Sequence, residues 1–435
     1  MRRTSITIAA LVATSVALLS CGSYNSSSSS SQGSTSGLKF RAFVSNPLRP
    51  LSTGGTTPLL EIVDALQDKL PGSVVNLQGA NPNPGIMVLS PNKKFTLVFS
   101  ASNNVLTAID NATEALVQSG SGAAPSITLP GFSDSVVVGS DNLTAYAAVS
   151  TTTVVGQSPG AVEVLNLSTG TISATLPVSG ARTIVGSHNG NRILAFGDRA
   201  DTVTVIAPSL IGTNADPRTV VQDSAAFDHP VWATFSSDDS TAYILNCGLE
   251  CGGAAASVTV FDLNTNTPGA SIPVNAATIG LLSGNTLYVA GTPPGISCGS
   301  GTAATICGMV NVIDLNSMTV TGSSVITDGF HYRMELGSNG QIFIGAKNCT
   351  NINIPASGSN PGEVRGCLSI FNTSNSSVVV PPDNGDVTGL QPITNRNVVY
   401  VVQQGELRIY DTTTDKLQSV QIDILGQAID VKLVD

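Results

Sequence analysis

The chain has 435 residues, and its 19 basic and 29 acidic side chains give a formal net charge of -10 at pH 7. An acidic chain without a basic block is a poor partner for nucleic acid and for an anionic lipid surface. Apolar residues make up 41% of the chain and charged residues only 11%, so there is ample material for a folded core.

The N-terminus predicts export. Two basic residues precede an apolar run from Ile6 to Leu19, which is too short to cross a bilayer and is typical of a signal-peptide core. The run leads into LLSC, ending at Cys21, which resembles the lipobox of bacterial lipoproteins. The resemblance implies removal of residues 1–20 and lipidation of Cys21. Because Gly22 stands where an inner-membrane retention signal has Asp, it also implies location at the outer membrane or cell surface. The alternative is an ordinary secretory signal followed by an unrelated cysteine.

The segment 21–38 is dominated by Ser and Gly, as in GSYNSSSSSSQGSTSG. Such a segment cannot bury apolar surface and is predicted to be a flexible tether. No second segment of this kind follows, so residues 39–435 are predicted to form one domain that contacts the membrane only through the lipid.

Apolar residues alternate with polar ones over short runs from residue 39 onward, and turn residues separate the runs, which predicts an all-β domain. One strand pattern recurs, and its Asp or Asn is expected to open a turn by accepting backbone hydrogen bonds. Its instances are LEIVD, LTAID, VEVLN, VTVFD, VNVID, LSIFN and LRIYD, with VTVIA, ending at Ala207, as a degenerate member. Strands of other types precede and follow each instance. Four antiparallel strands per repeat are typical of a β-propeller blade.

Two features of these repeats resemble the YVTN-repeat propeller family of bacterial and archaeal surface proteins. Phe43-Val44-Ser45-Asn46 stands where that family has Tyr-Val-Thr-Asn, and Ser90-Pro91-Asn92 and Ser236-Ser237-Asp238 match its Ser-Pro-Asp turn. The resemblance implies architecture and no particular chemistry. We count eight four-stranded blades; seven is the alternative, because the family commonly has seven.

The two ends of the domain predict that the ring closes. In each repeat the Asp/Asn strand is the third, and the first and second strands precede it. The domain begins with Phe40–Asn46, which has the pattern of a second strand but no first strand before it, and it ends with Ala428–Val434, which has the pattern of a first strand with nothing after it. Pairing these two segments completes one blade and removes two open sheet edges.

Six cysteines remain after Cys21, in three pairs: Cys247 with Cys251, Cys298 with Cys307, and Cys349 with Cys367. Each pair falls between the second and third strands of one of three consecutive repeats. In an exported protein this spacing predicts three local disulfides, which staple three long loops on one face of the ring. The zinc alternative needs four thiolates together or nearby histidines, which the spacing does not suggest.

Six residues are predicted to surround the mouth of the central channel on that face. They lie in or beside the connections that lead into innermost strands: Arg182, His229, Trp232, His331, Tyr332 and Arg333. We take His229 and His331 as equivalent positions, and His188 is expected on the opposite face. The alternative for each histidine is a packing or capping role, and for Trp232 a place in the core.

The sequence contains no hydrolase or metalloprotease motif, and the DLNTN turn lacks the Gly and distal Glu of a calcium loop. No cofactor or metal is therefore predicted. The leading hypothesis is a lipid-anchored binding or scaffold module for an envelope or extracellular protein or glycan, without affinity for nucleic acid. The alternatives are a lactonase-like hydrolase or lyase that uses His229, His331, Arg333 and Asp134, and a surface-coat component.

Overall fold

The computed structural model describes residues 35–435 except 119–125, 199, 296, 299–304, 351, 355–362 and 382–384. The predicted signal peptide, Cys21 and most of the predicted tether lie outside the described residues, as does the side chain of Cys298. In the described part of the chain, the helices are two short 3-10 turns, η1 (Pro208–Leu210) and η2 (Gly248–Cys251). None of them has the length and hydropathy that a membrane span requires.

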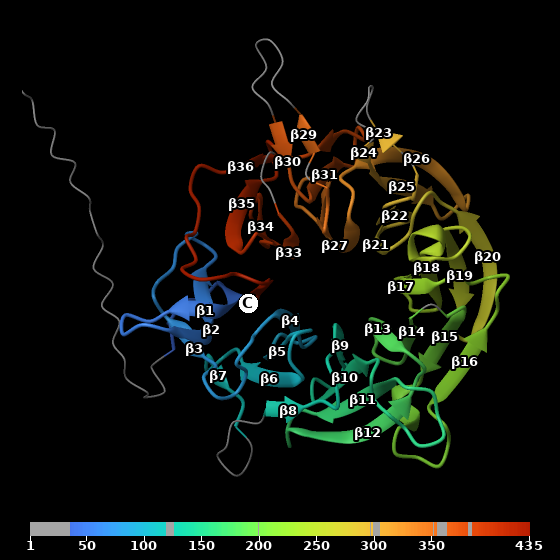
Figure 1. The fold of residues 1–435 in the computed structure, drawn as a ribbon, viewed down its shortest axis with the longest axis horizontal. Helices are drawn as coiled ribbons and strands as arrows, with labels where there is room; N and C mark the ends of the chain where they lie inside the picture. The colour runs from blue at the N-terminus through green and yellow to red at the C-terminus, as the bar shows by residue number, and fades with distance from the viewer. Residues whose placement is uncertain are drawn as a thin grey trace, which may run out of the picture. The chain divides into compact units, whose positions relative to one another are not determined.

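The described residues form eight four-stranded antiparallel blades in a ring, as predicted, and this is a β-propeller (Figure 1). The first blade contains β1 (Arg41–Pro50), β2 (Thr56–Asp64), β3 (Val74–Asn76) and β37 (Val431–Leu433), and the second contains β4 (Ile86–Leu89), β5 (Phe95–Phe99), β6 (Val105–Asp110) and β7 (Ala115–Leu116), with β8 (Ser126–Thr128) also paired to β6. The third blade contains β9 (Ser135–Val138), β10 (Thr144–Val149), β11 (Ala161–Asn166) and β12 (Thr171–Pro177). The fourth blade contains β13 (Ala181–Gly186), β14 (Ile193–Gly197), β15 (Thr202–Ile206) and β16 (Arg218–Gln222).

The fifth blade contains β17 (Pro230–Phe235), β18 (Thr241–Asn246), β19 (Ser257–Asp262) and β20 (Thr267–Pro273), and the sixth contains β21 (Ile279–Ser283), β22 (Thr286–Gly291), β25 (Gly308–Asp314) and β26 (Thr319–Ile326). The seventh blade contains β27 (Phe330–Leu336), β28 (Gln341–Lys347), β31 (Leu368–Asn372) and β32 (Val378–Val379). The eighth blade contains β33 (Val387–Pro392), β34 (Val398–Gln403), β35 (Glu406–Asp411) and β36 (Lys416–Leu417). The first strand of each of these blades lies nearest the centre of the ring (Figure 1).

The ring closes by pairing of the two chain ends, which confirms the prediction. Strand β1 pairs antiparallel with β37, with Val44 opposite Val431 and Ala42 opposite Leu433. This pairing gives the first blade its fourth strand, so neither terminal strand is left as an unpaired edge.

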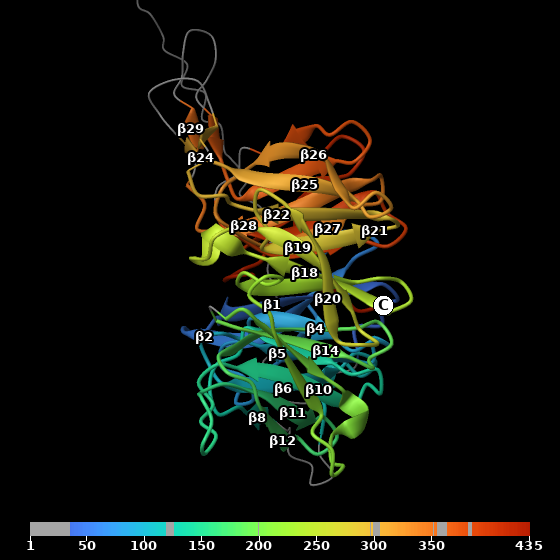
Figure 2. The ribbon, with the colours of Figure 1, turned by 90° about the vertical axis from the view of Figure 1, so that its right-hand side faces the viewer.

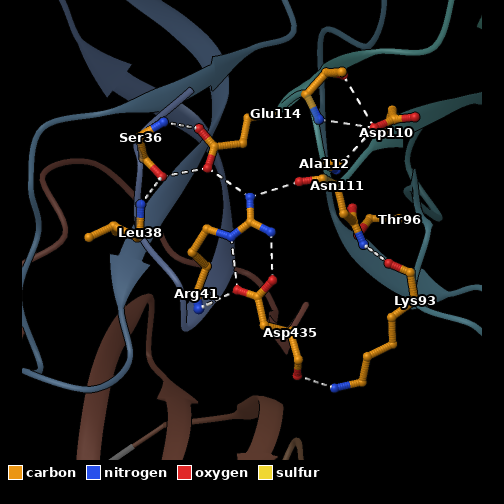
Figure 3. A network of polar contacts seen from close by, with 11 residues as sticks. Ser36, Leu38, Arg41, Lys93, Thr96, Asp110, Asn111, Ala112, Glu114 and Asp435 are labelled. Carbon is orange, nitrogen blue, oxygen red and sulfur yellow. Dashed lines mark hydrogen bonds and ion pairs between the residues drawn. The ribbon is translucent and has the colours of Figure 1, made fainter. Parts of the chain in front are cut away.

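Arg41 ties this closing blade to its neighbour (Figure 3). Its Nε and Nη2 donate to the two carboxylate oxygens of Asp435, at 2.8 and 2.6 Å, beyond the end of β37. Its Nη1 donates to Glu114 Oε1 at 2.8 Å and to the backbone oxygen of Asn111 at 2.7 Å, both in the second blade. One guanidinium therefore links the C-terminus, the first strand and the second blade.

The apolar core lies between adjacent blades rather than at the centre of the ring. Phe343 of β28 and Tyr410 of β35, for example, pack edge to face across the interface of the last two blades, with ring centroids 6.3 Å apart. The recurrent Asp and Asn residues open turns as expected, and Asp262 accepts the backbone N–H groups of Asn264 and Thr265 at 2.8 and 3.0 Å. Such local bonds explain why the motif repeats with each blade.

Two of the predicted disulfides are formed, Cys247–Cys251 and Cys349–Cys367. Cys307 is also disulfide-bonded, and its predicted partner, Cys298, has a side chain outside the described part. The loops are extended by η2 and by two hairpins, β23 (Ser297–Cys298) with β24 (Thr305–Ile306), and β29 (Ile352–Ile354) with β30 (Glu363–Arg365). Strands β24 and β29 project on one side of the ring (Figure 2). We call this side, which carries the connections between second and third strands, the stapled face.

Candidate functional site: the channel mouth

A cavity of about 840 Å³ opens on the stapled face, at the mouth of the central channel. Its wall is built by the inner strands of the second to seventh blades and by the η2 loop, which contributes Glu250, Cys251 and Gly252. The volume lies in the range of small-molecule sites. A smaller cavity of about 490 Å³, lined in part by His188, opens on the opposite face. The sequence analysis expects His188 on that face.

The structure brings five of the six predicted residues to the wall of the larger cavity: Arg182, His229, Trp232, Tyr332 and Arg333. His331 is not among them, since its side chain is fully buried. Burial lowers the pKa of His331 to about 4, so the imidazole is neutral at pH 7. A Cβ added at Gly308 would approach the ring within 2.6 Å, which shows how tightly the neighbouring blade packs on it.

The two histidines are not equivalent, which corrects the sequence interpretation. His331 is the second residue of β27 and aligns with Pro230 of β17, so the counterpart of His229 is Phe330. A shift of one residue turns a side chain to the other face of a strand. His229 therefore faces the cavity from the connection before β17, whereas His331 faces the core.

Bulges aim side chains at the cavity. The inner strands β13, β17 and β27 each lose register near their first residues, at Arg182, Val231 and Tyr332 respectively, and these three residues line the cavity. An extra residue in a strand bends it and redirects its side chains. The bulge at Tyr332 lets Tyr332 and Arg333 both reach the wall, although a regular strand would point successive residues to opposite sides.

A cluster of aromatic and cationic side chains forms the wall of the seventh blade. The Tyr332 hydroxyl donates to the backbone oxygen of Val387 at 2.7 Å, and burial raises the pKa of Tyr332 to about 12. The Arg333 guanidinium lies 5.1 Å from the Tyr332 ring centroid, and the Lys347 ammonium lies 4.4 Å from it on β28. Both distances fit cation–π contacts. Lys347 was missed by the sequence analysis, which treated β28 only as a repeat strand.

Arg182 stands on the fourth blade between two carboxylates. Its guanidinium lies 3.6 Å from Asp134 and 3.3 Å from Asp198, and its side chain is 58% exposed. An ion pair this exposed contributes little to stability, so the arginine is free to exchange these partners for a ligand.

His229 and two neighbouring carboxylates, those of Asp201 and Asp228, could together hold a metal ion. His229 Nδ1 lies 3.0 Å from Asp228 Oδ1 and 3.8 Å from Asp201 Oδ1, and the potential ligand atoms of the three residues all fall within 4.8 Å of one another. Asp228 Oδ2 accepts the backbone N–H groups of Ala254 and Ala255, each at 2.7 Å, so the loop that follows η2 holds this carboxylate in place. The sequence analysis predicted no metal, since these residues are not close in a recognisable motif.

Glu250, in η2, is a further group that sequence reasoning missed. Its Oε2 accepts the backbone N–H of Thr292 at 2.7 Å, which joins the stapled loop of the fifth blade to the sixth. Burial raises the pKa of Glu250 to about 7, so the carboxyl titrates near neutral pH at the wall of the cavity.

No protein-family model and no curated protein sequence matches the chain. Among solved structures, the dihydro-heme d1 dehydrogenase NirN in complex with DHE superposes with a TM-score of 0.61 at 12% identity, over 91% of this chain and 75% of that chain. The Kuenenia stuttgartiensis hydrazine synthase gives a TM-score of 0.45 at 15% identity, over 77% of this chain and 80% of that one. At 12% identity the likeness to the dehydrogenase shows the propeller fold alone, and the similarity to YVTN repeats remains a prediction.

Proposed function

We propose that the protein is a lipid-anchored, extracytoplasmic propeller that binds a glycan in the cavity of its stapled face. The observation that carries this proposal is the cavity itself, about 840 Å³ in volume, with aromatic and charged side chains converging on it from several blades. The lipid anchor and the location at the outer membrane or cell surface are part of the proposal and are supported by the lipobox-like sequence that ends at Cys21.

The chemistry of the wall suits a sugar better than an apolar ligand. Trp232 and Phe330 offer apolar ring surface for the C–H face of a sugar, and Arg182 with Asp198 offers charged hydrogen-bonding groups for its hydroxyls. All four side chains lie on or beside strands of the ring, so little ordering is needed when the ligand binds. The disulfide Cys247–Cys251 further restrains the loop that forms one edge of the cavity.

The full-length protein, purified in detergent from its membrane, should bind oligosaccharides on a glycan array. Replacing the exposed Arg182 by Ala is expected to lower the affinity for the bound glycan about tenfold, because a charge-assisted hydrogen bond is lost. Arg218→Ala is the matched control, since Arg218 also pairs with an aspartate but does not line the cavity. An array without any bound glycan, or equal affinities for Arg182→Ala and wild type, would overturn the proposal.

The second candidate is a hydrolase or lyase of the lactonase type, and the Asp201–Asp228–His229 set beside the cavity favours it. A divalent cation there could polarise a carbonyl oxygen or activate water. Metal analysis of protein prepared without chelators, together with an activity screen on lactones and polysaccharides, separates the two candidates. Activity that disappears in His229→Ala would favour the enzyme, and metal-free, inactive protein that binds glycan would favour the binding module.

A further inference from the structure

A half-buried cation in the cavity wall has no counter-ion among the residues that the structure describes. Lys347, the last residue of β28, lines the cavity, and its ammonium makes no ion pair or hydrogen bond with any residue that the structure describes. It lies instead 4.4 Å from the ring centroid of Tyr332 and 5.9 Å from that of Phe330. Burial lowers the pKa of Lys347; the negative charge of Asp134 offsets part of this effect, and the positive charge of Arg333 adds to it.

The carboxylates near Lys347 have other partners. Asp386 Oδ1 accepts the backbone N–H of Asn348 at 2.7 Å, and Asp134 pairs with Arg182 at 3.6 Å. Both act on Lys347 only at longer range. Removing a charge from water without a counter-charge is unfavourable, and the cation–π contacts offset only part of that loss. Packing alone would be served equally well by an apolar side chain of the same length.

The backbone nevertheless holds Lys347 firmly in this place. Lys347 pairs with Phe330 in the register of β27 and β28, and two residues later Cys349 is bridged to Cys367. Gly329, with φ +94°, lets the chain pass close to the Lys347 carbonyl, where an added Cβ would lie within 2.6 Å of the oxygen. The backbone of Lys347 is thus fixed at the cavity wall, and the contacts with the rings of Tyr332 and Phe330 position its ammonium there.

We infer that the ligand of this cavity is an acidic glycan, and that its anionic group is the counter-ion that Lys347 lacks. The inference rests on the proposed function and adds to it the charge of the ligand. A uronate carboxylate and a sulfate ester share the chemistry that the ammonium would recognise, so both belong in the test.

Isothermal titration calorimetry of the full-length protein tests the inference. The three probes are an oligogalacturonide, a sulfated galactan oligosaccharide and the neutral galactan oligosaccharide of the same length. At least one acidic probe should bind more than tenfold more tightly than the neutral one, with affinity that falls as salt rises. Lys347→Met should lower that affinity about tenfold or more, and Lys347→Arg should retain most of it. Lys94→Met is the matched control, because Lys94 also lies over a phenylalanine ring, Phe95, but away from the cavity.

Equal affinity for the acidic and neutral probes, unchanged in Lys347→Met, would overturn the inference and leave the proposed function standing. Absence of binding for all three probes would overturn the inference, and the proposed function would fall with it only if the glycan array were also empty. The unliganded protein supplies a second measurement, since Lys347→Met removes an uncompensated charge and keeps the packing on the rings. Its melting temperature should equal or exceed that of wild type, and a fall of several degrees would assign the lysine a structural role instead.

Discussion

The guanidinium of Arg41 reinforces the ring closure made by β1 and β37, and this can be tested with Arg41→Met. Methionine keeps the apolar length of the side chain and removes its charge and all its donors. In the native protein those donors bind Asp435 beyond the last strand and Glu114 in the second blade. The substitution therefore leaves the packing nearly intact and removes the side-chain bonds to Asp435 and Glu114, while the backbone N–H of residue 41 still donates to Asp435.

The expected loss follows from the burial of the partners. The side chain of Glu114 is only 5% exposed and that of Asp435 25%, so removing Arg41 leaves one carboxylate buried without its cation. Breaking a buried ion pair in this way costs about 3–5 kcal/mol. A folded unit of roughly 400 residues has an unfolding entropy near 0.8 kcal/mol per kelvin, so the melting temperature should fall by about 4–6 °C.

Differential scanning calorimetry of wild type and variant at pH 7 measures this loss. Arg218→Met is the control. Arg218 forms an ion pair with Asp216, whose side chain is 55% exposed, and the loss of this exposed pair should cost less than about 1 kcal/mol. Adding Glu114→Gln to Arg41→Met should restore part of the stability, because no buried charge is then left alone. If Arg41→Met melted within 1 °C of wild type, the role assigned to this residue in closing the ring would be wrong.

Three further outcomes follow from the stapled face. Burial raises the pKa of Glu250 from 4.5 to about 7, so the folded protein holds this proton more tightly than the unfolded chain does. The stability of the wild-type protein should therefore fall as the pH rises from 4.5 to about 7. Glu250→Gln should abolish this part of the pH dependence, measured as melting temperature between about pH 5 and pH 8. Replacing Cys349 and Cys367 together by Ala opens a loop with a sequence separation of 18 and should cost about 3 kcal/mol, measured by denaturant unfolding, and an unchanged midpoint would contradict the chain-entropy argument. Gly253→Ala places a Cβ against the Asp228 carboxylate and should destabilise the protein by about 1–3 kcal/mol, whereas a neutral result would show that the loop relaxes freely.

The repeating architecture could be predicted from the sequence because its causes are local. The alternation in VTVFDLN specifies a strand with two different faces, and Asp262 closes the turn after it with bonds to residues two and three positions away. Pairing of β1 with β37 followed from counting the strands at each end, and the disulfide Cys247–Cys251 followed from spacing.

The site itself was decided by tertiary structure. A bulge at Tyr332 and a one-residue offset between His229 and His331 determine which side chains meet in the channel mouth, and neither leaves a signal in the local pattern. Lys347 gains its importance only because the closed ring places it in a wall without a carboxylate partner among the described residues. Strand periodicity is a property of neighbours along the chain, whereas the direction of a side chain at a strand end and its charge environment depend on blades that are distant in sequence.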